Sequence, residues 1–151
     1  MHTSLRAAIT QKYLTMQYLL RILRMKGGRI TVRKIFFYRD RSGNEPVFEY
    51  LKELTAKTDK NSRINANKIN DYIEILRVYG TQAGEPYIKH LDGEIWELRP
   101  LRNRILFVAW TGDGYVLLHH FIKKTQKTPA REIEKAKREL ADLIERGADY
   151  E

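Results

Sequence analysis

The sequence of 151 residues contains no cysteine and only four histidines. Without cysteine neither a disulfide nor a thiolate metal site can form, and this composition fits a reducing cytosol. The histidines are His2, His90, His119 and His120, and they show no HExxH spacing. No GxxxxGK[ST] or GxGxxG loop is present either. We therefore expect neither a metal ion nor a nucleotide cofactor.

Long apolar runs are also missing, because Lys, Arg or His interrupts each of them. A membrane-spanning helix needs about 20 consecutive apolar residues, so we expect no membrane partner. The chain is nevertheless 42% hydrophobic. That is enough for one domain with a real core, and the length is too short for two comfortable ones.

Acidic residues are absent from the first 39 positions, since the first one is Asp40. The stretch before it carries nine basic residues, namely Arg6, Lys12, Arg21, Arg24, Lys26, Arg29, Arg33, Lys34 and Arg39. The rest of the chain has 19 basic and 19 acidic residues, so the net charge of +9 belongs to the N-terminal stretch. Basic surfaces bind polyanions. A nucleic-acid site after residue 39 must therefore come from local clustering of charge.

Residues 4–25 have apolar positions at helical spacing with basic residues between them, and Gly27-Gly28 follows. This predicts a basic amphipathic helix. It has three interpretations: a transit-peptide-like address, an accessory helix, or translated sequence upstream of a true start at Met25 instead of Met1. We expect residues 1–29 to be an extension, residues 30–147 to form the domain, and residues 148–151 to be a tail.

The pattern after residue 29 predicts an α+β domain. Residues 30–38 read as a strand, a helix opens at Pro46, and a second helix ends at Gly80, which together predicts a helical hairpin. Residues 94–98, 104–110 and 115–122 read as an antiparallel meander. A last helix should be capped by Thr128 and end at Gly147. Its inward residues should be Ile133, Ala136, Leu140, Leu143 and Ile144. We expect the helices on one face of the sheet.

Basic side chains stand at the ends of these three strands: Arg99, Arg102, Arg104, and the stretch from His119 to Lys124. Strand pairing should gather them. The period of two places His119 with Lys123 on one face and His120 with Lys124 on the other, unless a bulge intervenes. Each residue alone is explained by a solvated strand edge or a packed histidine. Together, Arg99, Arg104 and Lys124 could stabilise the transition state of phosphoryl transfer, which needs several converging cations.

The segments "FYRDRSGNEPVFEYL", "YIKHLDGEIWELRP", "NRILFVAW" and "LLHHFIKKTQKTPAREIEKAKREL" occur in this order. Over residues 33–146 they resemble the phage Gp49-like, HigB-type branch of the RelE/ParE toxin superfamily. The resemblance implies a RelE-like fold and a toxin of a type II toxin–antitoxin system in the bacterial cytoplasm. Its partners would be an antitoxin of the helix-turn-helix type and mRNA on the ribosome.

The resemblance also implies an mRNA interferase, a metal-independent endoribonuclease that inhibits translation. The 2′-hydroxyl of the RNA would attack the adjacent phosphate, while Arg99, Arg104 and Lys124 stabilise the phosphate and His119 transfers a proton. The implied RNA-binding residues are Arg102, Lys123, Lys127 and His120. This chain departs from many relatives in the tight "RPLRNR" turn, which leaves the register of Arg102 and Arg104 open, and in His120, where a small residue is more usual.

Two alternatives have the same fold but no RNA cleavage. One is a ParE-like poison of DNA gyrase, and the other is a non-catalytic nucleic-acid-binding protein derived from a phage. The convergence of Arg99, Arg104 and Lys124 favours the nuclease, because a pure binder has no need to direct several cations at one phosphate. His119 also keeps a structural alternative as a packing histidine on a central strand.

Overall fold

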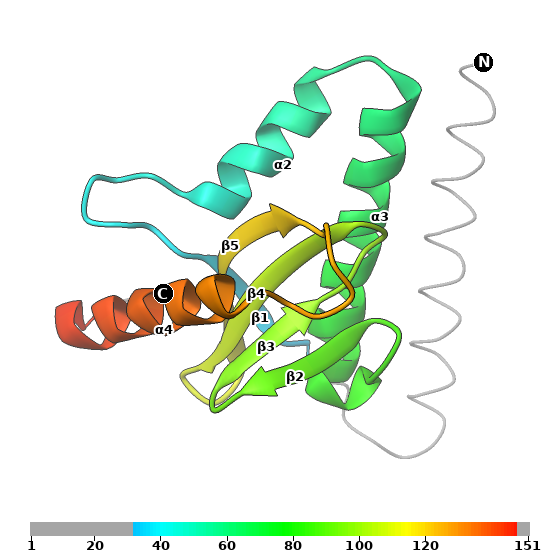
Figure 1. Ribbon diagram of the computed structural model, residues 1–151. Helices are drawn as coiled ribbons and strands as arrows, with labels where there is room; N and C mark the ends of the chain where they lie inside the picture. The colour runs from blue at the N-terminus through cyan, green and yellow to red at the C-terminus, as the bar shows by residue number, and fades with distance from the viewer. Residues whose placement is uncertain (1–31, 148–151) are drawn as a thin grey trace. The chain divides into compact units, whose positions relative to one another are not determined.

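The computed structural model describes residues 32–147, which form an α+β domain with a five-stranded mixed sheet and three helices (Figure 1). Its elements are β1 (Lys34–Phe37), α2 (Pro46–Ala56), α3 (Lys60–Tyr79), a 3₁₀ turn (Gly80–Ala83), β2 (Ile88–Asp92), β3 (Ile95–Leu98), β4 (Asn103–Trp110), β5 (Gly114–Ile122) and α4 (Ala130–Arg146). Within this range no helix is long and apolar enough to cross a membrane. The predicted extension over residues 1–29 and the tail over 148–151 lie outside the described residues.

The sheet has the strand order β1-β5-β4-β3-β2. The predicted antiparallel meander of β3, β4 and β5 is confirmed. Two features of the sheet were not predicted. Strand β1 pairs parallel with β5, so that Lys34 lies opposite Gly114. Strand β2 pairs with β3, and the Asp92-Gly93 turn joins the two as a hairpin.

Helices cover both faces of the sheet, so the prediction of helices on one face is wrong. On one face, α2 and α3 pack against Ile105, Phe107 and Leu117. On the other face, α4 packs against Leu106 and Val108 and their neighbours. Successive residues of β4 thus enter different cores, because side chains alternate along a strand. This explains why "ILFV" is a continuous apolar run, as is typical of a strand buried on both faces.

The helical hairpin forms as predicted, with its ends set by local chemistry. Pro46 occupies the first turn of α2, where its missing N–H costs nothing. Asp59 caps α3 by accepting a hydrogen bond from the backbone N–H of Ser62 at 2.9 Å. Gly80 ends α3 with φ +64° and ψ −158°, a conformation that strongly favours glycine.

Helix α4 differs from its prediction at the start and on one face. Its N-cap is Pro129 and no side chain caps it, because the hydroxyl of Thr128 donates instead to Glu97 at 2.6 Å. Gly147 ends the helix in the left-handed conformation, as predicted. Ala136 and Leu143 are fully buried, whereas Ile144 is 62% exposed. Ile144 was wrongly predicted to face inward, since one residue turns a helix by about 100°.

Candidate active site

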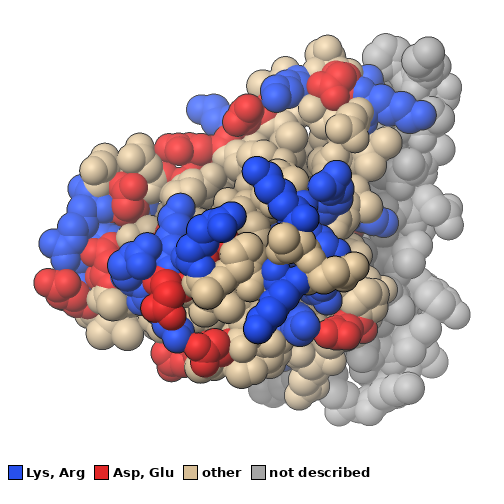
Figure 2. Space-filling model, viewed as in Figure 1, with Lys and Arg blue, Asp and Glu red and all other residues tan. Residues whose placement is uncertain are grey.

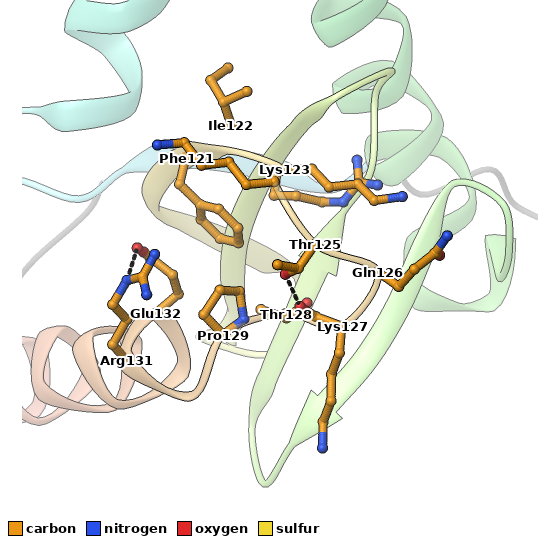
Figure 3. A pocket seen from close by; sticks show the side chains of 12 residues that line it. Phe121, Ile122, Lys123, Thr125, Gln126, Lys127, Thr128, Pro129, Arg131 and Glu132 are labelled. Carbon is orange, nitrogen blue, oxygen red and sulfur yellow. Dashed lines mark hydrogen bonds and ion pairs between the residues drawn. The ribbon is translucent and has the colours of Figure 1, made fainter.

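A pocket of about 550 Å³ opens where β5 ends and α4 begins (Figure 3). The residues that line it are Arg104, Phe121, Ile122, Lys123, Lys124, Thr125, Gln126, Lys127, Thr128, Pro129, Arg131 and Glu132. Strand β4 supplies Arg104, the loop after β5 supplies the lysines, and the first turn of α4 supplies Glu132. The volume falls in the range of about 300–1,000 Å³ that is common for ligand sites.

The chain leaves the sheet after Ile122, which decides how the lysines are placed. The backbone N–H of Lys123 donates to the carbonyl of Arg102 at 2.7 Å, and the Arg102 guanidinium donates to the Lys123 carbonyl at 3.1 Å. Beyond this point the strand alternation no longer applies. Lys123 and Lys124 therefore both line the pocket, and the prediction that they face opposite sides is wrong.

The lysines give the pocket positive charge. Lys124 and Lys127 are exposed and Lys123 is half-buried, and within residues 32–147 none of the three forms an ion pair with a carboxylate. Figure 2 shows Lys and Arg side chains gathered on the face of the molecule that carries this loop. Cations without acidic partners attract phosphate, so the loop is suited to a nucleic-acid backbone.

A buried carboxylate, Glu97, organises the arginines behind the loop. Its side chain is 1% exposed, and its Oε1 lies 3.4 Å from the Nε of Arg99 and 3.7 Å from the Nε of Arg104. Its Oε2 accepts the hydrogen bond from Thr128. The Arg99 Nε is close to Oε1 of Glu97 but not aligned for a hydrogen bond. Sequence reasoning missed Glu97, although a glutamate at a buried position of "EIWELR" signals a buried ion pair.

Arg104 is held by the backbone as well as by Glu97. The side chain is 6% exposed, and its Nη1 donates to the carbonyls of Leu101 and Asn103, each at 2.8 Å. Burial lowers the pKa of Arg104 from its ordinary value, and Glu97 opposes that change. An arginine stays protonated in proteins. The structure therefore places a fixed cation at the pocket wall, whereas Arg99 reaches the site only across Glu97 and does not line the pocket.

His119 is buried between two carboxylates of α4. Its ring is 1% exposed, with Nε2 at 2.8 Å from Glu132 Oε2 and Nδ1 in contact with Glu139 Oε1. A bulge positions it: His119 pairs with Leu106 while Leu117 pairs with Phe107, so Leu118 is the extra residue. His119 itself does not line the pocket, but Glu132 does. Neither glutamate was identified from the sequence.

His120 lies on the opposite face of the sheet, as the period of two predicts. Its ring stacks on Tyr50 at a centroid distance of 3.6 Å, and its Nε2 bonds Asn103 Oδ1 at 3.0 Å. Burial, with a smaller effect of His119, lowers the pKa of His120 to about 4. The ring is therefore neutral at pH 7. His120 is not among the residues that line the pocket, and an RNA-binding role for it stays a prediction.

The pocket holds one carboxylate beside its cations, and the geometry around it does not suit a metal ion. Glu132 and Glu139 approach opposite nitrogens of the His119 ring, so the three groups do not converge on one point. Residues 32–147 contain no group of three His, Asp or Glu side chains that could hold a metal ion. A ligand in this pocket would therefore meet the fixed positive charge of Arg104 and the lysines, with the carboxylate of Glu132 next to it.

Comparison with known proteins identifies the family. A sequence model of the family described as "Phage derived protein Gp49-like (DUF891)" matches residues 49–141, well over half of the chain. This range includes Glu97, Arg104, the lysine loop and Glu132. No curated protein matches the chain. The chain therefore belongs to the phage-derived Gp49-like family, a toxin-like family of the RelE group.

Proposed function

We propose that this protein is a HigB-type toxin of a type II toxin–antitoxin system and that it cleaves mRNA on the ribosome. The observation that carries the proposal is the pocket lined by Arg104 and three lysines. None of these lysines forms an ion pair with a carboxylate of residues 32–147. Membership of a toxin-like family in the RelE group supports the same function. The location would then be the bacterial cytoplasm, where the ribosomes are.

In the proposed reaction the 2′-hydroxyl of one nucleotide attacks the adjacent phosphate, without a metal ion. Negative charge develops on the non-bridging oxygens of the phosphorane. Arg104, already held by two carbonyls and Glu97, and Lys124 would stabilise this charge. Lys123, Lys127 and Arg102 would hold the RNA backbone on either side. Arg99 would act through Glu97, by sharing that carboxylate with Arg104.

The antitoxin of this proposal is a protein with a helix-turn-helix domain that covers the cationic pocket. An acidic segment laid across Lys123, Lys124 and Lys127 would neutralise the charge that RNA needs. Such a complex would keep the toxin inactive. The charge that would bind the substrate thus supports an acidic partner as well.

Lys124→Ala tests the function, because Lys124 is exposed and its loss should not disturb folding. Wild type and variant are induced in a bacterial host, and primer extension maps cuts on a translated mRNA and on the same mRNA without its start codon. We expect cuts only on the translated mRNA, reduced about 10-fold to 100-fold in the variant through lost charge stabilisation.

Lys135→Ala is the matched control, since Lys135 is an exposed lysine of α4 that does not line the pocket. It should cleave like the wild type. Growth arrest with intact mRNA would contradict the nuclease and direct attention to a bound target such as DNA gyrase. Equal cleavage by the Lys124 and Lys135 variants would instead remove Lys124 from the site.

A further inference from the structure

The pocket is connected to a buried row of three titratable side chains. Glu139, His119 and Glu132 follow one another, with the imidazole between the carboxylates. Glu139 is 8% exposed and His119 1% exposed. The Glu132 side chain is 18% exposed, and it is the member of the row that lines the pocket. Of the three residues in this row, Glu132 is therefore the one in direct contact with the pocket.

The contacts within the row determine how many protons it holds. A neutral imidazole has one N–H and one acceptor nitrogen, and an ionised carboxylate only accepts hydrogen bonds. Both ring nitrogens of His119 have a carboxylate oxygen as their partner. The row therefore carries one proton more than a neutral ring with two ionised carboxylates. In the form with an imidazolium, Glu132 is an ionised carboxylate whose Oε1 is not used by the ring.

Glu132 lines the pocket together with cations from the helix, the sheet and the loop. Its Oε1 lies 3.8 Å from the Nε of Arg131 in the same helix turn, while its Oε2 is occupied by His119. Arg104 from β4 and Lys124 from the loop line the same space. His120, the next residue of β5, lies on the other face of the sheet. Glu132 is thus the carboxylate among the residues that line the pocket, and Figure 3 shows it beside Arg131 at the start of α4.

We propose that Glu132 is the proton-transfer residue of the pocket and that His119 and Glu139 position it. The inference rests on the proposed RNA cleavage and assigns the step that the cations cannot perform. Glu132 Oε1 takes the proton of the ribose 2′-hydroxyl while the 2′-oxygen forms its bond to phosphorus. The bond from phosphorus to the 5′-oxygen breaks, and that oxygen takes a proton from water. The hydroxide that remains removes the proton from Glu132, which closes the cycle.

This assignment changes the role of His119 that the sequence suggested. The ring is too buried to touch RNA. It acts instead by holding Oε2 of Glu132, so that the other oxygen points into the pocket, and Glu139 fixes the ring from behind. General-base catalysis of this kind contributes about 100-fold to 10,000-fold.

Glu132→Gln is the decisive variant, because its amide oxygen can still accept the hydrogen bond of His119 but cannot take up a proton. Purified full-length protein is mixed with ribosomes that carry a translated mRNA, and the single-turnover cleavage rate is measured from pH 5.5 to 8.5, as is the affinity for the ribosome–mRNA complex. Glu134→Gln, an exposed glutamate of the same helix turn, is the control.

Glu132→Gln should lose about 100-fold or more of the cleavage rate at every pH, with binding unchanged and with Glu134→Gln like the wild type. Glu139→Gln should change the shape of the pH profile, because it acts through His119. A purely structural role for Glu139 would lower stability and leave the profile unchanged.

Two results would overturn the inference in different ways. A wild type that cuts translated mRNA, together with a Glu132→Gln variant that cuts at the same rate and with the same pH profile, removes Glu132 while RNA cleavage stands. A wild type that cuts no mRNA removes the proposed function and the inference with it. If Glu132→Gln fails to fold, Glu132→Asp takes its place, with a slower rate at every pH expected from a base withdrawn by one methylene.

Discussion

The neutral, stacked state of His120 makes the stability of this protein depend on pH in a defined window. The ring packs on Tyr50 and donates to Asn103. The direction of that bond follows from Asn103, whose amide nitrogen donates to Asn65 and Pro100, so that its oxygen must accept. Burial lowers the pKa of His120 from 6.5 to about 4.

The sign of the effect follows from which state binds the proton. Between about pH 6.5 and pH 4 the unfolded chain is protonated at His120 and the folded chain is not. The contribution of His120 to the free energy of unfolding is therefore fully present above pH 6.5. It is lost as the pH falls, and the loss levels off below about pH 4. The whole effect is about 3 kcal/mol, since one pKa unit corresponds to about 1.4 kcal/mol. At pH 5 the expected loss is about 2 kcal/mol.

His120→Gln isolates this group, because glutamine can donate to Asn103 but does not titrate. Urea unfolding of wild type and variant is measured between pH 8 and pH 4.5, and the difference between their unfolding free energies is taken at each pH. This difference should change by about 2 kcal/mol between pH 8 and pH 5, in favour of the variant at low pH. The NMR signal of the His120 ring should titrate near pH 4 and not near 6.5.

Parallel loss of stability in the two proteins would refute the reasoning, as would a ring that titrates near 6.5. Either result would mean that His120 is protonated in the folded protein at mildly acidic pH. The ring would then carry a positive charge beside its neighbour His119. The predicted contact of His120 with RNA would gain support from that outcome, since a neutral ring offers no charge to phosphate.

Two further predictions concern stability and are checked by chemical denaturation. Gly80→Ala should lower the free energy of unfolding by about 1–3 kcal/mol for the backbone, and by more because its Cβ would lie 2.7 Å from Arg33 Nε. Gly93→Ala, with φ +55° and open space around the Cβ, should lower it by only about 1–2 kcal/mol. Equal losses in the two variants would contradict the close contact at Gly80. Leu143→Ala should cost about 2–5 kcal/mol and Ile144→Ala less than about 0.5 kcal/mol, and the reverse order would contradict the buried face of α4.

The local elements of this fold could be predicted because their signals are local. Pro46, Gly80 and Gly147 act within one helix turn of their own positions, so the boundaries of the helices follow from them. The three strands of the meander were found from apolar runs and the turns between them. The order of the sheet was not, because the partner of β1 is β5, which is distant in the chain.

The faces of the sheet also required the tertiary structure. A strand such as β4, which is apolar at every position, has no polar face to tell which side is covered. The pattern of α4 indicates that one of its faces is buried but not against which side of the sheet. The prediction of a single helical layer failed for this reason.

The sequence alone pointed to a cluster of candidate cations and to the family to which the chain belongs. The basic residues stand in one short block and at strand ends, and charge clustering within a motif can be read directly. The tertiary structure decided what these cations surround. Glu97 meets Thr128 across 31 positions, and Glu132 meets His119 through a bulge at Leu118. Buried carboxylates are stable only with partners that folding brings to them, and no local pattern specifies those partners.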